Sequence, residues 1–319
     1  MVRRFAAVDL GSLTVRLAVA ELTGPKRFQV LGHYREVTGL GAGLAQDDRL
    51  APEDMARTFQ ALEGLVREMR AQGVGVSRVV ATQALRQARN REDFVRQVRE
   101  GLGLPVQILS PEEEARLSLQ GVLSALAPEF LTYPALVVFD VGGGSSEWAL
   151  IRRGQENRFA SLPLGVLTLS QARPLGDPPR PEAVAALHQE IEQRLGEFYQ
   201  QALQPHLSGA PRLVGTAGAV TTLAALALKM RRYDASRVNN LILTRTQVAA
   251  ITELLCGLPE GERARLPGME PAKAGVMVAG ALIILTIMKI FRQDSLVVID
   301  AGLLEGVLGE MAEKFGAGG

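Results

Sequence analysis

The chain has 319 residues, enough for two domains, and 47% of them are hydrophobic while 22% are charged, as in ordinary globular proteins. Its formal net charge of +1 gives no global attraction to nucleic acid or to a membrane surface. One cysteine, Cys256, excludes an internal disulfide, and together with only three histidines it argues against a zinc site. We therefore expect a reduced, cytoplasmic protein.

The first half of the chain alternates strand and helix patterns. Its first apolar run is interrupted by Asp9, too early for a signal peptide. The patterns that follow predict, in chain order, a helix over 51–73, a strand over 77–81, a helix over 90–103 capped by Asn90, and a strand over 105–109.

The second half opens with the stretch "FDVGGGSSEWAL", residues 139–150. Its flanks "ALVVF" and "SSEWALI" predict two strands, joined by a glycine-rich turn with Asp140 at its edge. Such a turn is either a tight connection alone or a set of backbone N–H groups and hydroxyls that hold a phosphate.

The remaining patterns continue the alternation of strands and helices. They predict a helix over 180–203, a strand over 211–215, a helix over 219–230, a strand over 295–302 and a terminal helix over 303–315. The most apolar segment, 274–288, is shorter than the roughly 20 residues that span a bilayer, so we expect a buried helix there. The alternation predicts an α/β fold.

A gapless internal repeat relates the two halves. "VDLGSLTVRLAV" (8–19) matches "FDVGGGSSEWAL" (139–150), with Asp9 over Asp140 and Gly11 over Gly142, 131 residues apart. Two related half-domains with a cleft between them would explain it. Coincidence is the alternative, since apolar–Asp–x–Gly turns are common.

Three glycine-rich turns follow apolar strands, and the third is "VGTAGAVTT", in which Gly215 and Gly218 bracket Thr216 ahead of a helix. The first N–H groups of a helix can hold an anion. Each turn alone is weak evidence, but three in one chain favour a bound polyphosphate group.

An acidic helix start follows in "LSPEEEARLSLQGV", residues 109–122. Ser110, Pro111 and Glu113 have the spacing of an N-cap, a first helical residue and a capping box. Glu114 is not needed for capping. It is either a helix-start acid or a group that orients and deprotonates a water molecule.

Charged residues near these turns have two readings each. Arg86 and Arg89 are either phosphate ligands or surface arginines after a strand. Asp140 and Glu147 either hold Mg²⁺, largely through waters, or are a turn cap and a surface strand residue.

Together these blocks resemble the exopolyphosphatase/guanosine pentaphosphate phosphohydrolase (Ppx/GppA) family in its short two-domain form. The resemblance covers nearly the whole chain and rests on "AAVDLGSLTVRLAVAE", "VVATQALRQARN", "ILSPEEEARLSLQGV", "VVFDVGGGSSEWAL", "SLPLGVLTL", "LVGTAGAVTTLAAL", "AGVMVAGALIIL" and "IDAGLLEGVL". It implies two similar domains of the actin, sugar-kinase and heat-shock-chaperone fold. We expect domain I at 1–125, with the terminal helix 303–319 packed back on it, and domain II at 126–302.

The resemblance also implies roles for individual residues. Glu114 is the expected general base, and Glu147 a second catalytic or metal-associated acid. Asp140, Glu147 and Asp9 are the expected acids of an Mg²⁺ site. The expected phosphate ligands are Gly11, Ser12, Arg86, Arg89, Gly142, Gly143, Gly144, Ser145, Gly215, Thr216 and Gly218.

The chain departs from the family pattern in two places. The first turn usually reads "GSN" or "GTN", but here Leu13 stands third, and its side chain cannot donate a hydrogen bond to phosphate. A late helix often starts "RAD", but here it reads "KAG", with Lys273 and Gly275. Both departures bear on substrate contacts and on activity.

The expected activity is Mg²⁺-dependent hydrolysis of a terminal phosphoanhydride bond in inorganic polyphosphate, in pppGpp or in both. This places the enzyme in the stringent response and requires no nucleic acid or membrane partner. An ATP-dependent kinase or ATPase of the same fold is one alternative, and a sensor that binds polyphosphate or a nucleotide without turnover is the other. A homodimer is the default expectation for the oligomeric state.

Overall fold

The computed structural model describes residues 4–24, 26–207 and 209–316, and the chain divides into two compact units. Unit 1 contains the described residues up to Ser124 together with those from Gly302 onward. Unit 2 runs from Ala125 to Ala301. Each unit is built on one β-sheet.

Unit 1 is a five-stranded sheet in the order β3-β2-β1-β4-β5. Strands β1, β2 and β3 are antiparallel neighbours, and β4 and β5 run parallel to β1. The strands are β1 (Arg4–Leu10), β2 (Thr14–Gly24), β3 (Arg27–Val37), β4 (Val76–Ala81) and β5 (Val106–Ile108). The helices are α1 (Leu44–Asp47), α2 (Pro52–Ala71), α3 (Gln83–Gln87), α4 (Arg91–Leu102), α5 (Pro111–Ala125) and α13 (Leu303–Gly316).

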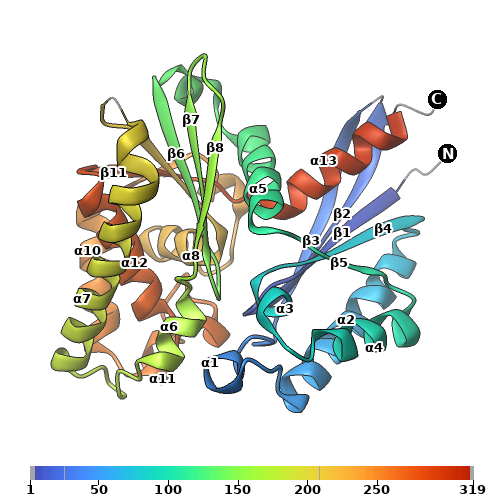
Figure 1. Ribbon diagram of the computed structural model, residues 1–319, viewed down its shortest axis with the longest axis horizontal. Helices are drawn as coiled ribbons and strands as arrows, with labels where there is room; N and C mark the ends of the chain where they lie inside the picture. The colour runs from blue at the N-terminus through green and yellow to red at the C-terminus, as the bar shows by residue number, and fades with distance from the viewer. Residues whose placement is uncertain (1–3, 25, 208, 317–319) are drawn as a thin grey trace. The chain divides into compact units, whose positions relative to one another are not determined.

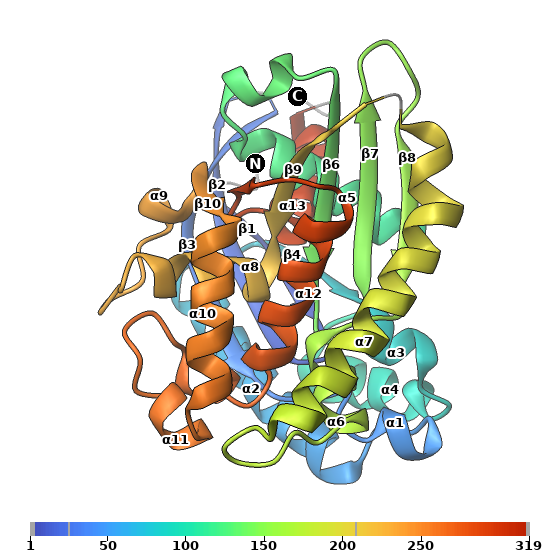
Figure 2. The ribbon, with the colours of Figure 1, turned by 90° about the vertical axis from the view of Figure 1, so that its left-hand side faces the viewer.

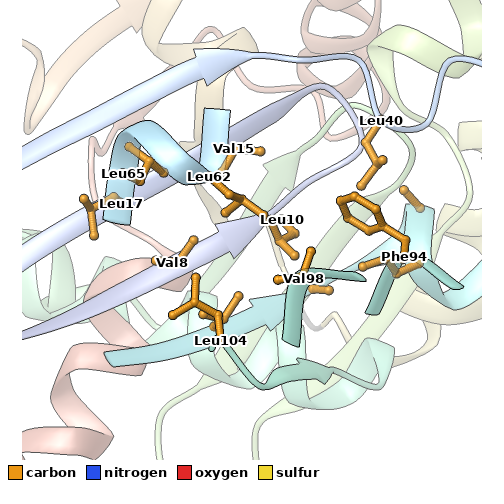
Figure 3. Packing of buried hydrophobic residues seen from close by; sticks show 14 of the residues in the cluster. Val8, Leu10, Val15, Leu17, Leu40, Leu62, Leu65, Phe94, Val98 and Leu104 are labelled. Carbon is orange, nitrogen blue, oxygen red and sulfur yellow. The ribbon is translucent and has the colours of Figure 1, made fainter. Parts of the chain in front are cut away.

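Strand β1 is apolar throughout because both of its faces are covered. Side chains alternate between the faces of a strand, so Ala6, Val8 and Leu10 point to one side and Phe5 and Ala7 to the other. The first set packs with residues of α2 and α4 in one buried cluster (Figure 3). The second set packs with residues of α5 and α13 in another. Helix α13 lies along β1 and β2 (Figure 1), so the end of the chain completes the core of unit 1.

Unit 2 is a six-stranded sheet in the order β10-β11-β9-β6-β7-β8. Its strands are β6 (Ala135–Val141), β7 (Ser146–Arg152), β8 (Arg158–Leu162), β9 (Arg212–Thr216), β10 (Leu241–Thr244) and β11 (Ser295–Val298). Its α-helices are α6 (Val166–Ala172), α7 (Pro181–Phe198), α8 (Ala217–Ala227), α9 (Ala235–Val238), α10 (Arg245–Gly257), α11 (Glu260–Arg263) and α12 (Met277–Ile290). Short 3₁₀ or π turns occupy 128–132, 199–206 and 271–273. Figure 2 shows α7, α8, α10 and α12 gathered on one side of this sheet.

The two sheets repeat one topology. The order β8-β7-β6-β9-β11 of unit 2 follows β3-β2-β1-β4-β5 of unit 1, with β10 added at the edge. The register repeats as well, since Asp9 pairs with Arg16 across β1 and β2, and Asp140 pairs with Glu147 across β6 and β7. The internal repeat and the α/β fold predicted from the sequence are therefore confirmed.

Two local expectations have different outcomes. The apolar segment predicted as a buried helix forms α12, whose side chains are mostly buried. Among the described residues, no helix combines the length and the apolarity that a membrane crossing needs. Asn90 occupies the N-cap position of α4, as predicted, but its side chain makes no capping hydrogen bond. Its amide instead bonds both backbone groups of Leu50, accepting from the N–H at 2.9 Å and donating to the carbonyl at 3.0 Å.

Candidate active site

The turn after β1 is held from its carbonyl side. The Gly11 amide donates to the Thr14 carbonyl at 3.0 Å, which closes the turn. The carbonyls of Ser12 and Leu13 accept hydrogen bonds at 2.9 Å from the amides of Thr38, Gly39 and Gly41. The amides of Ser12 and Leu13 donate to none of the described residues. Two such N–H groups suit an anion, and the Leu13 backbone offers one although its side chain cannot.

The turn after β6 is built in the same way. The Gly142 amide donates to the Ser145 carbonyl at 2.9 Å. The carbonyls of Gly142 and Gly143 accept hydrogen bonds at 2.8–3.2 Å from the amides of Val166, Leu167 and Thr168. Across the described chain, the amides of Gly143 and Gly144 donate to no residue. This turn therefore also presents two N–H groups.

Close backbone contact holds the second turn. A Cβ at Gly165 would lie 2.4 Å from the Gly143 carbonyl oxygen, so only glycine fits there. The closest glycine contact on the first turn is looser, because a Cβ at Gly41, whose amide donates to the Ser12 carbonyl, would lie 3.0 Å from the Ser12 Cβ. The supporting segments around Gly41 and Gly165 have no local sequence pattern that indicates a distant partner, so their contacts with the turns could not be predicted.

Asp9 is buried and ion-paired. It is 2% exposed, and its Oδ2 accepts from Nη2 of Arg16 at 2.7 Å and from Nε at 2.9 Å. Its Oδ1 is buried without a hydrogen-bond partner among the described residues. The predicted role of Asp9 in a metal site stays a prediction, and that Oδ1 is the atom that would serve it.

Glu147 is held by hydroxyl groups. It is 3% exposed, and its Oε1 accepts hydrogen bonds from Ser145 Oγ at 2.7 Å and Ser161 Oγ at 3.1 Å. Asp140 and Glu147 lie opposite each other on neighbouring strands, so both carboxylates belong to one face of the sheet. Two carboxylates fit Mg²⁺, which keeps several waters and takes one or two protein carboxylates near phosphates. Within the described ranges, no group of three or more His, Cys, Asp or Glu side chains forms a metal cluster.

The first turn of α5 carries Glu114. The predicted capping box is confirmed, because the Ser110 amide donates to Glu113 Oε2 at 2.8 Å and the Glu113 amide donates to Ser110 Oγ at 3.2 Å. These hydrogen bonds lower the pKa of the Glu113 carboxyl. Glu114 is 8% exposed, and its Oε2 accepts a hydrogen bond from Arg86 Nη1 at 2.5 Å. The capping acid and the buried acid are thus separate residues.

The two arginines predicted to bind phosphate have different surroundings. Arg86 donates to Glu114 and to the Leu109 carbonyl, and its side chain is 19% exposed. Arg89 is exposed and reaches Asp48 at 3.4 Å. Their contact with phosphate stays a prediction.

The third turn begins α8. The Thr216 hydroxyl donates to the Ala301 carbonyl at 2.7 Å, and Ala217 adopts a φ of 68°, a left-handed conformation that strains alanine. A Cβ at Gly218 would lie 3.1 Å from Lys273 Nζ, and Lys273 is buried and paired with Glu270 at 2.8 Å. A buried ammonium group therefore lies beside this turn. This contact could not be predicted from the sequence, because Lys273 and Gly218 are far apart in the chain.

Gly275, the second departure from the family pattern, also has a carboxylate beside it. A Cβ at this position would lie 3.2 Å from Oε1 of Glu260, the first residue of α11. Where the family pattern has an aspartate and this chain has Gly275, the carboxylate of Glu260 from α11 therefore lies close by.

The strands bring these groups to one edge within each unit. In unit 1, the first turn follows β1, Arg86 follows β4 and Glu114 follows β5, and these three strands are parallel. In unit 2, the second turn follows β6 and the third follows β9, which is parallel to β6. Ligands of α/β proteins bind at the carboxyl ends of parallel strands. These features identify a protein built from two actin-like units whose turns are of the phosphate-binding type.

The sequence profile of the Ppx/GppA phosphatase family matches residues 18–315, and the chain belongs to this family. It is 31% identical to a protein named exopolyphosphatase 2 from Mycobacterium tuberculosis, over 95% of this chain and 97% of that protein. It is also 31% identical to the Aquifex aeolicus member of the Ppx/GppA family, whose crystal structure superposes with a TM-score of 0.78 over 98% of each chain. An exopolyphosphatase from Cytophaga hutchinsonii shares the fold, with a TM-score of 0.88, 21% identity and 98% coverage of each chain.

Proposed function

We propose that this phosphatase hydrolyses the terminal phosphoanhydride bond of inorganic polyphosphate and releases phosphate. The observation that carries the proposal lies in unit 1. A turn with two N–H groups that donate to no described residue follows β1, and a buried, ion-paired glutamate follows β5. Both strands run parallel to β4, which lies between them, so the two features lie at the same edge of the sheet. The M. tuberculosis relative named exopolyphosphatase 2 supports polyphosphate as the substrate.

Each group has a part in the reaction. The amides of Ser12 and Leu13, and those of Gly143 and Gly144, bind phosphoryl oxygens through N–H donors. Glu114 orients the attacking water and accepts its proton. Phosphoryl transfer depends mainly on positioning and on electrostatic stabilisation, so a misplaced water removes most of the rate.

We assign the divalent cation to Asp140 and Glu147. Mg²⁺ bound there would offset the charge on the phosphoryl group as the bond breaks. Ser145 and Ser161 hold the Glu147 carboxylate by their hydroxyls and so fix the direction in which it presents its oxygens.

The nucleotide pppGpp is the second candidate substrate. The groups that the turns leave without an acceptor among the described residues are backbone amides, which recognise phosphate and not the rest of the molecule. The family name covers both activities. A terminal phosphoanhydride attached to a nucleoside is therefore accepted by the same groups.

The test is phosphate release with Mg²⁺ from long-chain polyphosphate, pppGpp and ATP side by side, by the wild type and by Glu114→Gln. The proposal predicts release from polyphosphate, and a kcat lower by about 10²- to 10⁴-fold in Glu114→Gln with substrate affinity retained. Transfer of phosphate from ATP to an acceptor would identify a kinase. Tight binding without release from any substrate would identify a sensor and make Leu13 and Gly275 the residues to revert.

A further inference from the structure

Arg86 connects three elements of unit 1. Its side chain extends from α3 and uses the single nitrogen Nη1 to donate to the Leu109 carbonyl at 3.0 Å and to Glu114 Oε2 at 2.5 Å. Leu109 lies just after β5, and its own amide donates to the Ala81 carbonyl at the end of β4 at 2.9 Å. The guanidinium group therefore ties the start of α5 to the ends of both strands.

The ion pair between Arg86 and Glu114 lies mostly out of solvent. The Arg86 side chain is 19% exposed and the Glu114 side chain 10%. A buried carboxylate is strongly stabilised by a compensating charge, so removing the arginine takes away the cation beside Glu114 and a hydrogen bond that fixes the direction of its carboxylate. The neighbouring acids Glu112 and Glu113 on the same turn are exposed, and Glu113 is fixed by Ser110.

Arg86 uses one nitrogen of its guanidinium group for contacts within the protein. Both hydrogens of Nη1 are used within the protein. Arginine is well suited to this use because its guanidinium is planar and always charged, and its donors are fixed in direction.

We propose that Arg86 is a positioning residue that holds the Glu114 carboxylate in its reactive orientation, and that its effect on turnover runs through Glu114 and not through phosphate binding. The inference rests on the proposed function, in which Glu114 is the general base. It changes the role that the family resemblance gives Arg86.

The first experiment measures kcat and KM for polyphosphate with Arg86→Gln and Arg86→Lys. Arg86→Gln is expected to lower kcat about 10- to 100-fold while KM stays within about twofold. Arg86→Lys keeps the charge without the fixed geometry and is expected to recover about tenfold of that loss. Arg96→Gln is the matched control, because Arg96 forms an exposed ion pair with Asp93 in the same unit and is expected to leave both constants unchanged.

The second experiment measures polyphosphate affinity in the Glu114→Gln background by calorimetry. Adding Arg86→Gln to Glu114→Gln is expected to leave the dissociation constant and the residual kcat unchanged, because the carboxylate that Arg86 positions is already gone. A phosphate ligand would behave differently, since its removal would weaken binding about tenfold or more in either background.

The outcomes separate this inference from the proposed function. A raised KM in Arg86→Gln, a further loss of affinity in the double variant, or an unchanged kcat would each overturn the positioning role alone. A wild type that releases no phosphate would overturn the proposed function and this inference with it. Thermal melting monitors folding, and if Arg86→Gln does not fold, Arg86→Lys must still show a lower kcat at unchanged KM.

Discussion

The two hairpins of the repeat share their turns and differ in the residues that face each other across their strands. In unit 1, Asp9 pairs across the sheet with Arg16, and Arg16 with Arg35. At the equivalent positions of unit 2, Asp140 pairs with Glu147, and Glu147 with Ser161. We call each set of three residues that face one another across neighbouring strands a row. The row of unit 1 carries one acid and two arginines, and the row of unit 2 carries two acids and a hydroxyl.

This difference shows how two units with the same fold can carry different chemical groups at equivalent positions. The turns need only backbone N–H groups, so they are alike in both units. The binding properties of the rows depend on their side chains, and the residues at these positions differ between the two units. A cationic row suits phosphate, whereas paired carboxylates suit a divalent cation.

The largest expected effect is on stability, and it compares how tightly the backbone is packed against each turn. Gly165→Ala would place a Cβ 2.4 Å from a backbone carbonyl, and we expect it to lower the free energy of unfolding by about 3 kcal/mol. In Gly41→Ala the new Cβ would lie 3.0 Å from the Ser12 Cβ and 3.4 Å from its backbone, and the change should cost about 1 kcal/mol. Urea unfolding of the two variants measures both values. Equal costs would show that the turns are supported alike.

The next prediction concerns how the buried acids are compensated. Arg16→Gln leaves Asp9 buried without its cation and should lower the free energy of unfolding by about 2–3 kcal/mol, with Asp9→Asn restoring much of it. Ser161→Ala removes one neutral donor from Glu147 and should cost about 1 kcal/mol. Denaturant titration of each variant compares the two rows. A larger cost for Ser161→Ala would reverse the contrast.

Two arginines of unit 1 that lie away from the turns pair with Glu310, and these ion pairs make the free energy of unfolding depend on pH. Burial alone would raise the pKa of Glu310, but its hydrogen bonds and ion pairs with Arg78 and Arg116 hold that pKa below its ordinary value. The stabilisation is therefore complete above the unfolded pKa of about 4.3 and is lost as the pH falls through the lower folded pKa. We expect about 1 kcal/mol to disappear below about pH 4 in the wild type.

The measurement is the free energy of unfolding across this pH range for the wild type and Glu310→Gln. The variant should show a shallower decline in acid. Asp93→Asn, which removes an exposed acid, should retain the wild-type slope. Identical slopes in Glu310→Gln and the wild type would contradict the assigned contribution.

The smallest effect concerns the third turn. Ala217→Gly relieves a left-handed φ that costs alanine about 1–2 kcal/mol, but adds unfolded-state entropy worth about 0.5–1 kcal/mol. A net gain of about 0.5 kcal/mol is expected in thermal unfolding. Ala219→Gly in the same helix lacks the positive φ and should destabilise. A loss of stability in both variants would show that Ala217 is unstrained.

Local patterns in the sequence predicted much of this structure. Strand alternation and glycine turns predicted both hairpins, the gapless repeat predicted their common register, and the Ser110–Glu113 spacing predicted the capping box. Each of these depends on neighbours within a few residues, or on a comparison of the chain with itself.

Contacts between distant segments were not predictable in this way. Arg86 meets Glu114 28 residues on, Ser161 meets Glu147 across a second hairpin, and Gly165 packs on the turn at 143–144. Asn90 illustrates the same limit, because a tertiary contact with Leu50 overrides its local capping preference. These partners are set by the order of strands in the sheet.

The most direct test of the division between the units is phosphate release from polyphosphate as a function of Mg²⁺ concentration, for the wild type, Glu147→Gln and Glu114→Gln. The account predicts that Glu147→Gln needs a Mg²⁺ concentration about tenfold or more above the wild type for half-maximal rate. Glu114→Gln should lose kcat at an unchanged Mg²⁺ requirement. A shifted Mg²⁺ requirement in Glu114→Gln, or an unshifted one in Glu147→Gln, would contradict the assignment of base to unit 1 and cation to unit 2.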